Sequence, residues 1–130
     1  MHWVALVALL AALQSFVFGG LVARARGKYQ VTAPAVTGNE VFERYFRVHY
    51  NSNEQLIIFL PALWIYATYL SAIWAAGLGA LYLLGRTIYA IGYVRAPGKR
   101  SIGFYISGIP NGILLFGGIA GVVRTLLTQH

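Results

Sequence analysis

Long apolar runs alternate with short polar segments along the chain, and this pattern predicts four helices. The first run, residues 3–23, carries no charge and at about 1.5 Å rise per residue can cross a hydrocarbon core of roughly 30 Å. We place the helices at residues 3–24, 41–70, 72–94 and 102–127, the second being polar until Leu56. The prediction is a single all-α domain over residues 1–130, an integral membrane four-helix bundle.

Composition supports the membrane assignment and narrows the chemistry. The 130 residues are 58% hydrophobic and 10% charged, which is too apolar for a soluble domain of this size. The absence of cysteine excludes disulfides and a protein thiol nucleophile. His2, His49 and His130 are scattered, so we expect no metal site. Any thiol chemistry would need a thiol supplied by a substrate.

The net charge of +7 is concentrated in two of the three predicted loops. The first and third loops hold most of the cations: Arg24, Arg26, Lys28, Arg95, Lys99 and Arg100. The second connection, near Ser71, has no Lys or Arg. Because cytoplasmic loops of membrane proteins are enriched in Lys and Arg, we expect loops one and three in the cytoplasm and both termini on the opposite side. The charge is therefore explained by orientation and lipid headgroups, and nucleic-acid binding is not expected.

A polar stripe lies in the first half of the second predicted helix. Arg47, Asn51 and Glu54 stand at i, i+4 and i+7, so they share one face, and Arg44 lies one turn earlier. Ionisable groups at membrane depth cost several kcal/mol unless they are paired or hydrated, so they often mark a site.

The third predicted helix carries a second stripe. Tyr82, Arg86, Tyr89 and Tyr93 repeat at steps of four, three and four and again share a face. Together the two stripes offer guanidinium groups for carboxylates, a carboxylate for an ammonium, an amide and phenols. This inventory suits a small zwitterionic, peptide-like ligand with more than one carboxylate.

The stripes also have a purely structural interpretation. Arg44 and Arg47 could extend to the interface, Glu54 could neutralise one of them, and the tyrosines could form an interfacial belt. The spacing alone leaves both interpretations open.

Two motifs resemble a known family. Residues 42–54 read FERYFRVHYNSNE, followed by Pro61 and Leu63-Trp64. This run is similar to the second-helix signature of the MAPEG superfamily, the membrane-associated proteins in eicosanoid and glutathione metabolism. Residues 82–86 read YLLGR, and Tyr89, Tyr93 and Arg100 follow. This second run resembles the third helix and following loop of the microsomal glutathione transferase and leukotriene-forming synthase branch.

The resemblance implies a homotrimer that binds glutathione in a bent shape at each subunit interface. Matching positions on one subunit are Arg47, Asn51, Glu54, Tyr89 and Tyr93. Matching positions that help from the neighbouring subunit or close the cavity are Arg26, His49 and Arg86.

Arg100 matches the arginine regarded in this family as the activator of the glutathione thiol, and we expect it to be catalytic. The implied activity is that of a membrane glutathione transferase with glutathione as co-substrate. Its second substrate would be a hydrophobic electrophile or a lipid hydroperoxide, the latter in a peroxidase reaction. On charge alone, Arg100 is better explained as a loop cation that binds lipid headgroups beside Lys99, and the resemblance to the family motif reverses that order.

Two departures from the family pattern bear on this expectation. Gln55 stands where the branch commonly has an aromatic residue, and Gly27 replaces a basic residue of the leukotriene-forming enzyme. The second departure argues against leukotriene synthesis specifically.

Two other functions remain open. One is a noncatalytic MAPEG-like scaffold that binds lipid or glutathione. The other is a small multidrug transporter, which needs a carboxylate in the first helix where this chain offers only Gln14. In the fourth predicted helix, Gly108 with Gly112 and Gly117 with Gly121 have the small-xxx-small spacing of close helix packing.

Overall fold

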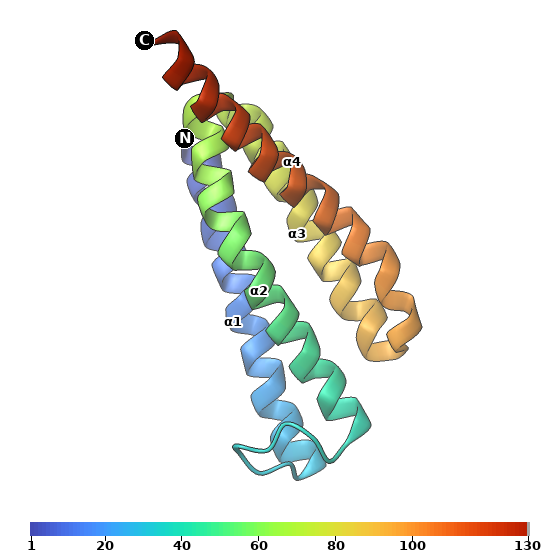
Figure 1. Cartoon of the computed structure of the whole chain (residues 1–130). Coiled ribbons are helices and arrows are strands. Elements are labelled where there is room, and N and C mark those ends of the chain that lie inside the picture. The colour runs from blue at the N-terminus through green and yellow to red at the C-terminus, as the bar shows by residue number, and fades with distance from the viewer. Residues whose placement is uncertain (130) are drawn as a thin grey trace.

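The computed structural model describes residues 1–129, which form four long α-helices and one turn of 3-10 helix (Figure 1). The elements are α1 (His2–Tyr29), α2 (Glu40–Tyr69), α3 (Ala72–Arg95), η1 (Pro97–Lys99) and α4 (Arg100–Thr128). The all-α prediction is confirmed. His130, one of the three histidines considered above, lies outside the described residues.

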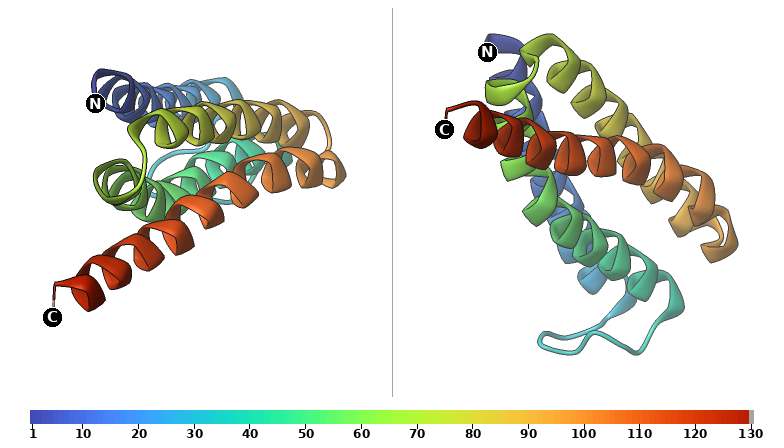
Figure 2. Two further views of the ribbon diagram at one scale, coloured as in Figure 1. Left: turned by 90° about the horizontal axis from the view of Figure 1, so that it is seen from above. Right: turned by 45° about the horizontal axis from the view of Figure 1, so that its top comes forward.

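The helices form two antiparallel hairpins that converge at one end and separate at the other. In Figure 1 both termini and the α2–α3 connection lie at the convergent end, whereas the α1–α2 loop and η1 lie at the separated end. Both α2 and α3 contact each of the other long helices, and α1 and α4 lie on opposite sides of them (Figure 2). The two basic connections therefore share one end of the molecule.

The predicted boundaries needed correction at both basic loops. Helix α1 continues beyond the predicted end at residue 24 and includes Arg26 and Lys28, because Arg, Ala and Lys are all good helix formers. It ends where Gln30 adopts a left-handed conformation with φ 57°. Arg100 likewise begins α4 instead of ending a loop.

The starts of α2 and α3 have side-chain caps. The Asn39 side chain accepts a hydrogen bond from the Phe42 amide at 2.9 Å, and Ser71 accepts one from the Trp74 amide at 3.2 Å. These caps satisfy backbone donors that a helix start leaves without intrahelical partners. The tight connection predicted near Ser71 is confirmed.

Three segments are long and apolar enough to cross a membrane: α1, α3 and residues Pro97–Thr128. Large apolar side chains are exposed on their outer faces, among them Trp3, Phe16, Ile73 and Leu127. Helix α2 has 30 residues but a polar first half, and its crossing of the membrane stays a prediction.

The apolar core fills the convergent half of the bundle. Phe59 and Leu63 of α2, Tyr82 of α3 and Leu114 of α4 are buried there, and the Phe59 and Tyr82 rings stack at a centroid distance of 3.9 Å. A separate cluster around Phe42 holds α1, α2 and their loop together at the other end. A third cluster joins Phe18 of α1, Val48 of α2 and Tyr89 of α3.

Helices α3 and α4 approach most closely at two glycines. A Cβ atom at Gly85 would lie 2.3 Å from the Ser107 backbone nitrogen, and one at Gly103 would lie 2.1 Å from the Tyr89 nitrogen. Both distances are below any real carbon contact, so only glycine allows this approach. The predicted packing role is also supported for Gly117 and Gly121, which lie against Tyr66 and Leu70.

Gly108 and Gly112 differ from this pattern. A Cβ atom at either position would meet nothing within 4 Å. The small-xxx-small spacing therefore marks a helix contact within this chain at Gly117 and Gly121. It marks no such contact at Gly108 and Gly112.

Replacing Gly103 by alanine should destabilise the protein, because the new methyl group meets α3 backbone. We expect a loss of about 1–3 kcal/mol, typical of overpacking, observed as a lower midpoint of thermal unfolding in detergent. Gly112→Ala is the matched control in the same helix and should unfold at the wild-type temperature or above it, since alanine favours helix. Equal midpoints for the two variants would contradict the close α3–α4 contact.

Candidate functional site

The guanidinium of Arg86 is buried between α2, α3 and α4, with 0% of the residue exposed. One terminal nitrogen donates to Asn51 Oδ1 and to Ser52 Oγ, both at 2.8 Å, and the other donates to Ser107 Oγ at 3.4 Å. Among residues 1–129 no carboxylate lies within ion-pair distance of it, and its Nε atom has no partner. Oxygen dipoles thus stabilise this buried charge in place of a counter-ion.

Aromatic rings extend from Arg86 toward the end of α3. The Arg86 guanidinium lies 4.0 Å from the ring centroid of Tyr89, which is itself 3% exposed. The Tyr89 and Tyr93 rings meet edge to face at 5.6 Å. The attraction between a cation and the ring face contributes about 0.5–2 kcal/mol, and more where water is excluded.

Arg100 lies at the far end of this row. Its guanidinium is 5.8 Å from the Tyr93 ring centroid and donates a hydrogen bond to the Pro97 carbonyl at 2.7 Å. The residue is exposed and is the first of α4, where unpaired backbone N–H groups add positive potential. We call Arg86, Tyr89, Tyr93 and Arg100 the arginine–tyrosine ladder; it runs from a buried cation to an exposed one.

The α2 stripe divides between this interior and the surface. Asn51 faces Arg86, whereas Arg47 and Glu54 are exposed. Within residues 1–129 the single ion pair joins Arg44 to Glu40 at 2.9 Å. Glu40, and not Glu54, therefore neutralises Arg44. The Glu54 carboxylate is exposed on the α2 surface, where a ligand could reach it.

Arg26 and His49 do not join the ladder within this chain. Arg26 donates to the Ala35 carbonyl at 2.6 Å and lies over the Phe42 ring at 4.9 Å, so it fastens the α1–α2 loop. His49 packs against α1 at Gly19, and its Nε2 atom is 3.2 Å from the Asn53 amide. On α2 it faces away from the Arg47 stripe.

Gln55 has a partner that the sequence did not reveal. Asn111 of α4 donates to Gln55 Oε1 at 3.1 Å, and Asn111 is 3% exposed. Where the branch commonly has an aromatic residue, this chain thus has an amide pair that joins α2 to α4.

Ser52 and Ser107 were also missed, although a signal existed. A buried arginine has five N–H donors, and without a nearby acid its acceptors must be hydroxyl, amide or carbonyl oxygens. Ser52 and Ser107 are two of the three serines within the predicted helices, and Ser107 lies one turn after Gly103 at the close approach. No group of three His, Asp or Glu side chains in residues 1–129 is arranged to hold a metal ion.

These observations define the class: an integral membrane helical bundle in which a row of arginines and tyrosines runs from the interior to the end that carries the basic connections. The profile of the MAPEG family matches residues 4–120. The chain belongs to the MAPEG family, as the two motifs had indicated.

Relatives over most of the chain agree with this assignment. Microsomal glutathione S-transferase 2 of Homo sapiens is 39% identical over 126 residues, covering 97% of this chain and 86% of the relative. Leukotriene C4 synthase of Cavia porcellus is 37% identical over 103 residues, covering 79% and 69%. An uncharacterized protein of Synechocystis sp. is 47% identical over 124 residues, covering 95% and 90%.

Replacing Arg86 by leucine should be strongly destabilising, because it leaves buried oxygens of Asn51, Ser52 and Ser107 without their donor. We expect a loss of about 3 kcal/mol or more, since each hydrogen bond to a charged group contributes roughly 1.5–3 kcal/mol. Arg124→Leu removes an exposed arginine from α4 and serves as control. The measurement is the midpoint of thermal unfolding of each variant in the same detergent. If Arg86→Leu lowered the midpoint no more than Arg124→Leu does, the result would contradict the buried network.

Proposed function

We propose that this protein is a membrane glutathione transferase that converts the glutathione thiol to thiolate for attack on hydrophobic electrophiles. The observation that carries the proposal is the position of Arg100 at the exposed end of the ladder, beside Tyr93. The names of the relatives, microsomal glutathione S-transferase 2 and leukotriene C4 synthase, support the same chemistry.

The polar groups on the ladder and the α2 stripe match the ligand. Glutathione has two carboxylates, one ammonium group and two peptide bonds. The exposed guanidinium of Arg47 would bind a carboxylate, the exposed carboxylate of Glu54 would bind the ammonium, and Asn51 and the tyrosine hydroxyls would bind peptide groups. Arg86 holds Asn51 in place from the interior and is a positioning residue in this proposal.

Arg100 would act electrostatically. A free thiol has a pKa of about 8.5, so only a few per cent is thiolate at neutral pH. A guanidinium close to the sulfur favours the anion, and lowering the thiol pKa by about 2 corresponds to roughly 2.7 kcal/mol. Because arginine stays protonated, it does not accept the thiol proton, which leaves to water.

The thiolate sulfur then forms a bond to an electrophilic carbon of the second substrate. Either a leaving group departs with its bonding electron pair, or a polarised double bond opens and the resulting carbanion takes a proton from water. In the peroxidase reaction it attacks the outer oxygen of a lipid hydroperoxide, the O–O bond breaks, and the departing alkoxide takes a proton. A second glutathione displaces water from the resulting sulfenic acid and gives glutathione disulfide. Both reactions begin with the same thiolate and the same activating cation.

The proposal includes a homotrimer with the site at the subunit interface. Its support in this chain is that Arg47 and Glu54 are exposed while Arg26 and His49 lie away from the ladder. A neighbouring subunit would supply the remaining contacts. We further propose that the end carrying the α1–α2 loop and η1 is cytoplasmic, because Arg95, Lys99 and Arg100 gather there with the basic end of α1.

Mixing glutathione with the purified protein should produce the ultraviolet difference absorbance of thiolate, and Arg100→Ala should abolish it while glutathione binding persists. The rate of conjugation at neutral pH should fall about 25-fold, because raising the thiol pKa from about 6.5 to about 8.5 lowers the thiolate fraction at pH 7 from roughly 76% to roughly 3%. Lys99→Ala, which removes the adjacent exposed cation, should retain the signal. Binding without thiolate in the wild type would favour the noncatalytic scaffold.

Cross-linking of the protein in native lipid should give a trimer as the largest abundant species. Mass spectrometry of the intact complex released from nanodiscs provides an independent measurement of subunit number. A purely monomeric protein that still forms thiolate would contradict the interfacial site while leaving the role of Arg100 intact.

A further inference from the structure

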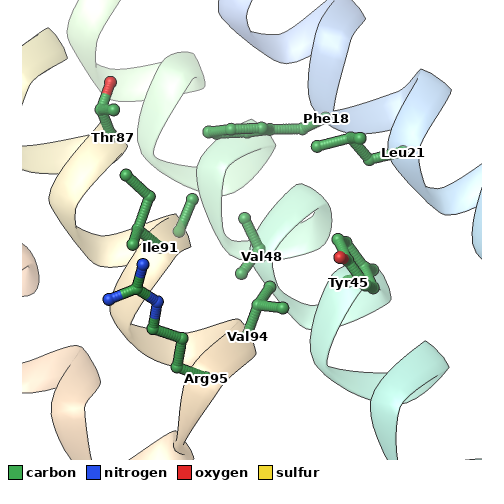
Figure 3. Close-up of a pocket in the computed structure, with 9 residues that line it drawn as sticks. Phe18, Leu21, Tyr45, Val48, Thr87, Ile91, Val94 and Arg95 are labelled. Atoms are coloured by element: carbon green, nitrogen blue, oxygen red, sulfur yellow. The ribbon is translucent and has the colours of Figure 1, made fainter.

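An apolar cavity of about 300 Å³ lies where the two hairpins separate (Figure 3). Phe18 and Leu21 of α1, Val48 of α2 and Val94 of α3 line it, with the ring of Tyr45 at one side. The cavity lies between the apolar core and the basic end of the bundle. In a membrane protein this is the depth at which hydrocarbon meets the headgroup region.

The cavity is distinct from the ladder although both use α3. Its lining residues Thr87, Ala90 and Val94 each directly follow a ladder residue in the sequence, so they point about 100° further around the helix. Packing of Phe18 and Val48 against Tyr89 forms the wall between them. A molecule in the cavity would therefore not reach a thiol held beside Arg100.

One cation stands at the rim of this otherwise apolar space. Arg95 lines the cavity and is exposed, and in Figure 3 its guanidinium points back along α3 toward Ile91, one turn earlier. The nearby Arg44 is paired with Glu40 and donates to the backbone carbonyls of Val94 and Arg95. Arg44 thus fixes the end of α3, whereas the charge of Arg95 is left for a ligand.

We propose that this cavity binds a single-chain amphiphile with a carboxylate head, the chain between α1, α2 and α3 and the carboxylate on Arg95. The positive charge of Arg95 supports an anionic head, and a carboxylate is an anion that a guanidinium binds with two parallel hydrogen bonds. The cavity volume supports a ligand with a single acyl chain, because it is at the lower end of the roughly 300–1,000 Å³ that small-molecule sites occupy. The proposal is independent of glutathione chemistry.

The test uses the full-length protein in phosphatidylcholine nanodiscs and a palmitate carrying a photoreactive diazirine. Trypsin cleavage after Arg86 and Arg95 releases residues 87–95, which hold the α3 wall of the cavity. Residues 101–124, between two other arginines of the lipid-facing α4, report ordinary lipid contact. We expect saturable labelling of residues 87–95 above that of residues 101–124, removed by unlabelled palmitate.

Variants separate the head and chain contributions. Arg95→Gln, whose tryptic peptide extends to Lys99, should raise the palmitate concentration needed for competition about tenfold or more. Arg124→Gln should leave the palmitate concentration needed for competition unchanged. Ile91→Trp should fill the cavity and abolish saturable labelling, whereas Ile109→Trp, at a similarly exposed position on α4, should leave it unchanged.

Three results would overturn the proposal. Equal labelling of residues 87–95 and 101–124 would mean lipid contact only. Equal competition by palmitate and its methyl ester would remove the role of the carboxylate. Stronger competition by hexadecyl phosphate than by palmitate would assign the rim cation to a phosphate headgroup.

Discussion

The arrangement of this bundle depends on stabilising one buried guanidinium without a counter-ion. Arg86 is fully buried, and its charge is met by oxygens of Asn51, Ser52 and Ser107, which come from α2 and α4. A cation in an apolar interior is tolerated only when such groups surround it. Helices α2 and α4 must therefore keep these oxygens within hydrogen-bond distance of Arg86 on α3. The bond from Arg86 also fixes the orientation of the Asn51 side chain.

The close approach of α3 and α4 provides the second half of this constraint. Gly85 and Gly103 bring the α4 backbone against α3, which places Ser107 near Arg86 and Arg100 near Tyr93. The same approach leaves the α1–α2 hairpin free to diverge at the basic end (Figure 1). The α3 residues of the ladder and the α3 wall of the apolar cavity lie on two faces of one helix, with the packing of Phe18 and Val48 against Tyr89 between them.

Helical spacing in the sequence predicted the ladder better than the rest of the site. Steps of three and four placed Arg86, Tyr89 and Tyr93 on one face, and they do contact one another in series. The orientation of His49 toward α1 and the capture of Arg26 by the first loop depend on tertiary packing, which no local pattern encodes. Ser107 was missed as well. A buried arginine without an acid indicates hydroxyl acceptors, but only the glycine contact with α3 brings this particular serine to Arg86.

A structure of the protein in nanodiscs with bound glutathione would test the central claim most directly, that Arg86 holds the site from inside while Arg100 meets the thiol. The sulfur should lie within hydrogen-bond distance of Arg100, with Asn51 still accepting from Arg86 and no ligand atom on the Arg86 guanidinium. Glutathione whose carboxylate contacts Arg86 directly, or whose sulfur lies away from Arg100, would contradict it.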